Sequence, residues 1–254
     1  MPTVTETCLG VDIGGSGIKS ALVDVDSGSL ESKYSRVETP QPATPEAVAA
    51  ELMEVVSGYE HDGPIGIGFP SVVDRAGVVR TAMNIDETWV GRNVVELFSQ
   101  VVGRDVTVVN DADAAAVAEG TFGVAAGVSG LVIVVTFGTG IGSGFLLNGV
   151  LAPNVELGAL ELDGHSPAES YFSAKARRTH DLSWDEWGGR ADRFLGHVNR
   201  VFTPELIVVG GGVARKWDEY AHMIDSALPV KPAEMGNVAG LVGAALVASG
   251  LSRK

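Results

Sequence analysis

The sequence predicts an α/β protein of two similar halves, each built around a strand, a glycine-rich turn and a second strand. The first such segment is CLGVDIGGSGIKSALVDVDSG (8–28) and the second is GLVIVVTFGTGIGSGFLLNGV (130–150). Elsewhere, apolar runs of strand length alternate with segments of helical periodicity. The repeat and the alternation together indicate an internally duplicated α/β fold with two lobes.

The other elements have recognisable ends. Thr44 and Pro45 supply a cap and a first-position proline for a helix, and Asn148-Gly149 is a strong hairpin signal. In chain order we predict a helix over 45–58, a strand over 64–70, a helix over 93–102, a strand over 105–110, helices over 111–120 and 184–202, a strand from 206 into a glycine turn, and a buried helix over 238–251. We place the first lobe at 1–111, joined by the C-terminal helix 238–254, and the second at 112–237.

Composition excludes several classes of protein. A net charge of −14 argues against nucleic acid as a partner, because a phosphate backbone is bound by positive surfaces. The first ten residues lack the basic and apolar regions of a secretory signal, so a cytoplasmic location is expected. The apolar stretch 238–251 is too short to span a bilayer. The single Cys8 lies in an apolar run and is expected in the core.

The glycine turns indicate phosphate binding without a helix. A dinucleotide fold or a P-loop follows its glycines with a helix, whereas here a strand follows both times. Such hairpin turns expose backbone N–H groups that can cradle a phosphate chain. Asp12, beside the first turn, makes chemical sense if a divalent cation bridges it to phosphates; the alternative is an aspartate that forms a turn with its own backbone.

Five motifs occur in the order typical of the actin-like (ribonuclease H-like) sugar kinases, and within them the chain resembles the ROK family. The likeness is strongest to its polyphosphate-using glucokinase branch, through ELDGHSPAES (161–170) and LSWDEW (182–187). It covers essentially the whole chain. The five motifs are DIGGSGIK (12–19), GIGFPSVVD (66–74), NDADAAA (110–116), TFGTGIGSG (136–144) and IVVGGGVA (207–214).

The resemblance implies roles for the phosphate side of a site. Asp12 would hold Mg²⁺ through water, and Asp111 would accept the proton of the attacking sugar hydroxyl. Judged alone, an Asn-Asp pair before a helix favours the simpler reading, in which Asp111 or Asp113 caps the helix. Residues expected to bind phosphates are Gly14, Gly15, Gly138, Thr139 and Gly140, and those expected beside a nucleotide are Gly210, Gly211 and Gly212.

The sugar side departs from the family. The resemblance assigns sugar binding to Asn110, Asp111, Glu156 and Glu169, but relatives carry Glu-x-Gly-His where this chain has Ala159 as the fourth residue. One lost hydrogen bond to a sugar hydroxyl costs about 1–3 kcal/mol. His165 is a candidate substitute or a surface-loop histidine. The cysteines of the family zinc site are absent, so no zinc is expected.

A basic helical face suggests where a polyanion could bind. Residues 171–216 carry a net charge of +3 within an acidic chain, and Arg190, Arg193 and Arg200 fall on one face of the predicted helix 184–202. With Lys175 they could form a track for polyphosphate; the alternative is a solvated charged face.

The expected activity is phosphoryl transfer from polyphosphate or ATP to the 6-hydroxyl of glucose, or of mannose, by a homodimer. Two alternatives stay open: a catalytically weakened paralogue, to which Ala159 gives weight, and a non-enzymatic sugar sensor.

Overall fold

The computed structural model describes residues 6–250 and divides them into two compact units. Unit 1 contains the described residues up to Ala118 and those from Val238 onward, and unit 2 contains residues 119–237. The sequence-based boundary at 111/112 therefore differs from the structural one by seven residues, and the helix Asp111–Thr121 runs through both. Residues 251–254, included in the expected C-terminal helix, lie outside the described part.

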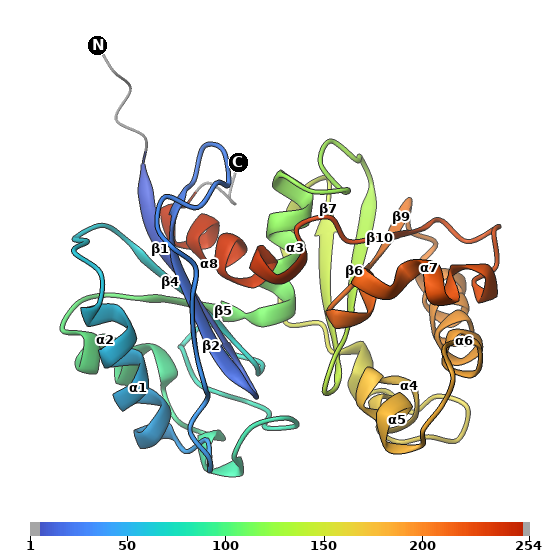
Figure 1. The fold of residues 1–254 in the computed structure, drawn as a ribbon, viewed down its shortest axis with the longest axis horizontal. Helices are drawn as coiled ribbons and strands as arrows, with labels where there is room; N and C mark the ends of the chain where they lie inside the picture. The colour runs from blue at the N-terminus through green and yellow to red at the C-terminus, as the bar shows by residue number, and fades with distance from the viewer. Residues whose placement is uncertain (1–5, 251–254) are drawn as a thin grey trace. The chain divides into compact units, whose positions relative to one another are not determined.

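Unit 1 is a mixed sheet with helices on both faces (Figure 1). The strand order is β3-β2-β1-β4-β5; β1, β2 and β3 are antiparallel neighbours, and β1, β4 and β5 run parallel. α1 and α2 cover one face and α8 covers the other. The strands are β1 Thr7–Gly14, β2 Gly17–Asp24, β3 Ser35–Val37, β4 Ile65–Phe69 and β5 Thr107–Asn110; the helices are α1 Pro45–Ser57, α2 Val94–Val102, α3 Asp111–Thr121 and α8 Ala239–Ser249.

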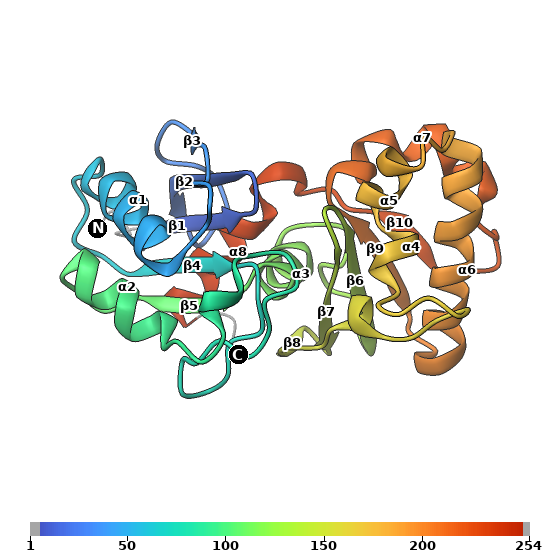
Figure 2. The same ribbon diagram turned by 90° about the horizontal axis from the view of Figure 1, so that it is seen from below.

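Unit 2 repeats the same topology. Its strand order is β10-β9-β6-β7-β8, so three antiparallel strands are again followed by two parallel ones on the side of the first. Figure 2 shows α4 to α7 gathered beside this sheet. The strands are β6 Leu131–Phe137, β7 Ile141–Leu147, β8 Val150–Ala152, β9 Leu206–Gly210 and β10 Val230–Pro232; the helices are α4 Glu169–Phe172, α5 Ala174–Thr179, α6 Trp184–Phe202 and α7 Trp217–Tyr220. The predicted duplication is confirmed.

Local signals explain most of the longer elements. The Thr44 side chain accepts from the N–H of Ala47 at the start of α1, and Ser183 and Glu186 form a capping box at the start of α6. Helix α6 continues through Gly188-Gly189. A β-carbon at Gly188 would lie 2.9 Å from the side chain of Met223. That glycine therefore permits close packing and does not interrupt the helix.

Each unit has its own aromatic core. In unit 1 Phe69, Trp89 and Phe98 make edge-to-face contacts with centroids 4.8–6.0 Å apart. In unit 2 Phe137 packs in the same way on Trp187 and Phe194. Cys8 is buried, as expected, and burial raises the pKa of its thiol to about 11. In the described part of the chain, no helix combines the length and apolar character needed to cross a membrane.

Helix α8 approaches its neighbours at backbone distance. A β-carbon on Gly10 of β1 would lie 2.2 Å from the carbonyl oxygen of Leu241, and one on Gly66 of β4 would lie 1.9 Å from that of Ala244. On the helix itself, a β-carbon at Gly243 would lie 1.7 Å from the carbonyl oxygen of Ala114 in α3. None of these three glycines has a positive φ, so backbone conformation does not require glycine there. Glycine is required because a β-carbon would not fit.

The close approach of α8 can be tested with one added methyl group. We expect Gly243→Ala to lower the free energy of unfolding by about 3 kcal/mol, because backbone must shift to admit the new atom. The matched control is Gly196→Ala in α6, where nothing lies within 4 Å of the added carbon. It should be neutral or stabilising by about 0.5–1 kcal/mol. Urea denaturation of both variants measures this, and equal effects would contradict the packing argument.

Candidate functional site

In unit 1 the predicted site residues meet at one edge of the sheet. The parallel strands β1, β4 and β5 end there, with Asp12 in register with Gly68 and Phe69 in register with Asn110. Strand ends of parallel sheets are where α/β proteins bind ligands. The first glycine turn and the Asn110-Asp111 pair, about a hundred residues apart in the chain, thus lie at the same edge.

The first glycine turn is a two-residue connection whose carbonyl groups are all engaged. Gly15 and Ser16 link Gly14 to Gly17 and are exposed. The Thr39 hydroxyl donates to the carbonyl of Gly14, the Gln41 amide donates to that of Gly15 at 3.3 Å, and the Arg36 guanidinium donates to that of Ser16 at 2.9 Å. Segment 36–41 therefore fixes the peptide planes of the turn, a function that sequence reasoning missed.

Asp12 is nearly buried and already has a cationic neighbour. Its side chain is 9% exposed, and its Oδ2 atom lies 2.7 Å from Nζ of Lys19, which stands opposite it on β2. The first turn of α8 covers the carboxylate: a β-carbon on Gly240 would lie 2.7 Å from Cγ of Asp12. Lys19 belongs to the motif that identified Asp12, yet only strand pairing shows that the two side chains meet.

Asn110 provides the cap of α3. Its side-chain oxygen accepts from the backbone N–H groups of Ala112 and Asp113 at 2.9 and 3.1 Å, and its amide donates to the carbonyl of Ser71. Asp111 occupies the first helical position, where its Oδ1 also accepts from the N–H of Ala112 at 2.8 Å. Asn110 therefore caps the helix, and Asp111 shares one of its N–H groups with it.

In unit 2 the second and third glycine turns adjoin each other. Gly138 to Gly140 connect β6 to β7, and β9 pairs with β6 so that Gly210 stands opposite Thr136. Gly211 has φ of +78°, and a β-carbon there would lie 2.5 Å from the carbonyl oxygen of Phe137. The backbone N–H of Lys175 donates to the carbonyl of Gly138, which places the first turn of α5 at the second glycine turn.

The two glutamates predicted to bind sugar also lie at this turn. The Glu169 carboxylate accepts from the backbone N–H of Ile141 at 3.0 Å, directly after the second glycine turn. The Ser143 hydroxyl donates to the carbonyl of Val155 and accepts from the N–H of Leu157, and so holds the backbone on both sides of Glu156. Burial, and then the charge of Glu169, raise the pKa of Glu156 to about 7.

Three of the remaining candidates, Arg190, Arg193 and His165, contact the side chain of Tyr171, and the other two are exposed. Arg190 lies over the Tyr171 ring at 3.7 Å, and the Arg193 guanidinium donates to the Tyr171 hydroxyl. The His165 ring stacks on the same Tyr171, with centroids 3.8 Å apart, while Ala159 ends a 3₁₀ turn and is exposed. Arg200 is exposed in the last turn of α6.

A magnesium ion would suit the surroundings of Asp12. Among residues 6–250, no three His, Cys, Asp or Glu side chains gather as a metal-binding group. Mg²⁺ is commonly held by one or two carboxylates, with water and substrate phosphates completing its coordination. A single carboxylate beside a phosphate-binding turn fits that pattern.

Comparisons with known proteins agree with the motifs. The sequence profile of the ROK family matches residues 8–170. The chain is 43% identical to a polyphosphate glucokinase of Mycobacterium tuberculosis (strain CDC 1551 / Oshkosh), over 93% of this chain and 89% of that protein.

Solved structures show the same fold. The inorganic polyphosphate/ATP-glucomannokinase from Arthrobacter sp. strain KM superposes with a TM-score of 0.92 at 44% identity, covering 96% of this chain and 99% of that one. A ROK family glucokinase from Streptomyces griseus, solved with glucose and AMPPNP, has a TM-score of 0.81 at 27% identity, covering 96% and 99%. The fold is that of the actin-like ATPases, as the sequence predicted.

The raised pKa of Glu156 predicts a pH-dependent stability. A carboxyl group whose pKa is raised by folding stabilises the folded state at low pH, and this contribution is lost as pH rises through about 7. We expect Glu156→Gln to raise the free energy of unfolding by about 1–2 kcal/mol at pH 8, allowing for solvent screening, and to change it little at pH 4.5. Urea denaturation at both pH values, with the exposed Glu161→Gln as control, measures this. A gain that is the same at both pH values would contradict it.

Proposed function

This chain belongs to the ROK family, and on that premise we propose that it transfers a phosphoryl group from inorganic polyphosphate or ATP to the 6-hydroxyl of glucose. Its likeness to polyphosphate glucokinases along nearly the whole chain carries the proposal. The sheet of unit 1, called sheet 1 below, supports the proposed activity, because Asp12, the first glycine turn and Asp111 lie together at one of its edges. Mannose is the second acceptor that we propose.

Asp111 is the proposed base for the sugar hydroxyl. Asn110 accepts from the N–H groups of Ala112 and Asp113, and the Asp111 carboxylate shares the N–H of Ala112 with it, so Asp111 is held at the start of α3 and at the edge of the sheet. The hydrogen bond from the N–H of Ala112 orients the Asp111 carboxylate. Phosphoryl transfer has a loose transition state, so a well-placed carboxylate is an adequate base for an alcohol.

The donor phosphates are proposed to bind the glycine turns. In unit 1, the bonds from Thr39, Gln41 and Arg36 hold the carbonyl groups of the turn and keep its peptide planes in one orientation. Asp12 would hold Mg²⁺ through water, and the ion, when bound, would neutralise charge on the phosphates. In unit 2 we assign phosphate contacts to Gly138, Thr139 and Gly140, and nucleotide contacts to Gly210, Gly211 and Gly212.

The sugar is proposed to bind Asn110, Asp111, Glu156 and Glu169. A pKa of about 7 means that Glu156 is partly protonated at neutral pH and can donate as well as accept a hydrogen bond. The exposed position of Ala159, three residues on, has room for the imidazole that relatives carry there. The weakened paralogue and the non-enzymatic sensor are not favoured, because the relatives at 43% and 44% identity over nearly the whole chain are a polyphosphate glucokinase and a polyphosphate/ATP-glucomannokinase.

The proposed polyphosphate track on α6 is modified by the structure. Lys175 remains part of the proposed track, because its backbone N–H donates to the carbonyl of Gly138 and its side chain is exposed. Arg190 and Arg193 are engaged with Tyr171, so they would contribute through their charge while keeping those contacts. Arg200 stays in the proposal as an exposed charge. The homodimer stays a prediction from the resemblance, and the cytoplasmic location stays a prediction from the sequence of the first ten residues.

Removing the base should abolish turnover while sparing sugar binding. We expect Asp111→Asn to lower kcat by about 10²–10⁴-fold in a coupled assay for glucose 6-phosphate. Asparagine keeps the size and hydrogen-bonding capacity of the side chain, so the dissociation constant for glucose should change less than tenfold. Asp105→Asn, which removes an exposed carboxylate just before β5, is the control and should retain wild-type activity. Retention of kcat within threefold by the Asp111 variant would refute the role of the base.

Restoring the family histidine tests the sugar side. We expect Ala159→His to raise kcat/KM for glucose at least about fivefold, the lower end of what one hydrogen bond to a hydroxyl contributes. Ala159→Gln, with a polar side chain of different geometry, is the control. An unchanged kcat/KM would contradict this expectation and would show that the site binds glucose without a histidine.

A further inference from the structure

Three charged side chains stand in one row across sheet 1. Asp12 on β1 is directly opposite Lys19 on β2, and Lys19 is directly opposite Arg36 on β3. Residues directly opposite one another point to the same face, with β-carbons about 4.5–5.5 Å apart. The row is therefore a continuous charged strip, and it lies on the face where α8 covers Asp12.

The row contains two cations and one anion. Lys19 is paired with Asp12 at 2.7 Å. Within the part of the chain that the structure describes, Arg36 has no carboxylate within 4 Å of its guanidinium group. Like charges directly opposite each other on neighbouring strands destabilise a sheet. A local excess of positive charge in a protein of net charge −14 therefore suggests that an anion completes the arrangement.

The Arg36 guanidinium lies against the first glycine turn. A β-carbon on Gly17 would be 2.7–2.8 Å from three atoms of this group, so Gly17 is the residue that admits it. One N–H donates to the carbonyl of Ser16, and the side chain is exposed. An arginine side chain has five N–H donors in a planar fork, which suits the paired oxygens of a phosphoryl group.

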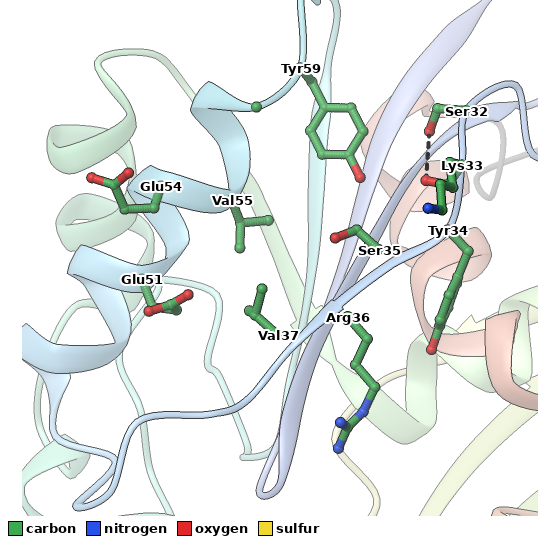
Figure 3. Close-up of a pocket in the computed structure, with 11 residues that line it drawn as sticks. Ser32, Lys33, Tyr34, Ser35, Arg36, Val37, Glu51, Glu54, Val55 and Tyr59 are labelled. Carbon is green, nitrogen blue, oxygen red and sulfur yellow. Dashed lines mark hydrogen bonds between the residues drawn. The ribbon is translucent and has the colours of Figure 1, made fainter.

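A groove on the other side of β3 is a less suitable anion site. It lies between β3 and α1, and Figure 3 shows Ser35 and Val37 pointing toward α1 while Arg36 points to the opposite side of the strand. Glu51 and Glu54 line the wall of the groove formed by α1. Lys33 and Arg36 also line the groove, so its two cations are offset by two carboxylates. The charged row has two cations and one carboxylate and is favoured over the groove.

We propose that Arg36 and Lys19 form an anion site beside the first glycine turn that binds phosphoryl groups of the donor, whether inorganic polyphosphate or the triphosphate of ATP. The site rests on the proposed function and adds two side chains to a phosphate cradle otherwise made of backbone and a metal ion. Lys19 can contact the donor while it stays beside Asp12, because an ammonium group has three donors.

Inorganic tripolyphosphate is the probe, measured by titration calorimetry with magnesium and without sugar, so that no turnover occurs. We expect Arg36→Met to raise its dissociation constant about tenfold, as for one exposed charge-assisted contact, and to reduce the salt dependence of binding. Arg36→Lys should recover part of the loss. In steady state, KM for polyphosphate and for ATP should rise by a similar factor, while KM for glucose changes less than twofold.

Two controls separate the charge from the support of the turn. Gln41→Leu removes the bond to the Gly15 carbonyl without changing charge, and it should raise the dissociation constant less than threefold. Arg92→Met removes an exposed arginine that is paired with Glu46, and it should leave binding unchanged. Thermal unfolding confirms that each variant is folded.

The proposal is overturned if folded Arg36→Met binds tripolyphosphate as the wild type does, or if Gln41→Leu weakens binding as much. Failure of the proposed function is distinguishable from these results. A wild-type protein that binds tripolyphosphate through Arg36 but forms no glucose 6-phosphate would retain the anion site and lose the kinase.

Discussion

Backbone contact between α8 and sheet 1 is the constraint on which unit 1 depends. The helix packs where β1 and β4 present Gly10 and Gly66, and its own Gly243 admits the carbonyl of Ala114 from α3. The same approach brings Gly240 onto the Asp12 carboxylate. If side chains separated α8 from the sheet, the helix would not cover the Asp12 carboxylate, and that carboxylate would be exposed to water. The geometry of the candidate metal residue thus follows from glycines that have no chemistry of their own.

Duplication explains why each unit has its candidate site residues at a comparable place. In both sheets an antiparallel hairpin carries the glycine turn, and parallel strands end beside that turn. Strand ends release the chain into loops at this edge, where Asn110 and Asp111 follow β5 and Gly210 to Gly212 follow β9. The units differ in what they place there. Unit 1 has Asp12 with two cations, whereas unit 2 has two glutamates, one of which has a raised pKa.

Electrostatics reconciles an acidic protein with an anionic donor. Most of the charge is negative, so a phosphate chain is repelled except where cations are held in place. Arg190 and Arg193 contact the ring and the hydroxyl of Tyr171. The Arg36 guanidinium donates to the carbonyl of Ser16 and lies against Gly17. The difference between them lies in their neighbours: Arg36 adjoins a turn with exposed glycine backbone, whereas the arginines on α6 adjoin an aromatic cluster.

The sequence by itself determined the two hairpins, the longer helices and strands, and the family, because glycine spacing, caps and apolar periodicity act over a few neighbouring residues. Asp12 became a candidate through the glycine turn beside it, whereas the role proposed for Asp111 came from the family resemblance. The sequence could not reveal the three-residue strands β3 and β10, which are too short to show a period, whereas the turn residues Asn148-Gly149 indicated the hairpin that contains β8. Only the tertiary structure set Arg36 opposite Lys19, Gly240 against Asp12, and Glu156 beside Glu169. Strand register and helix docking bring these residues together, and both depend on packing between segments far apart in the chain.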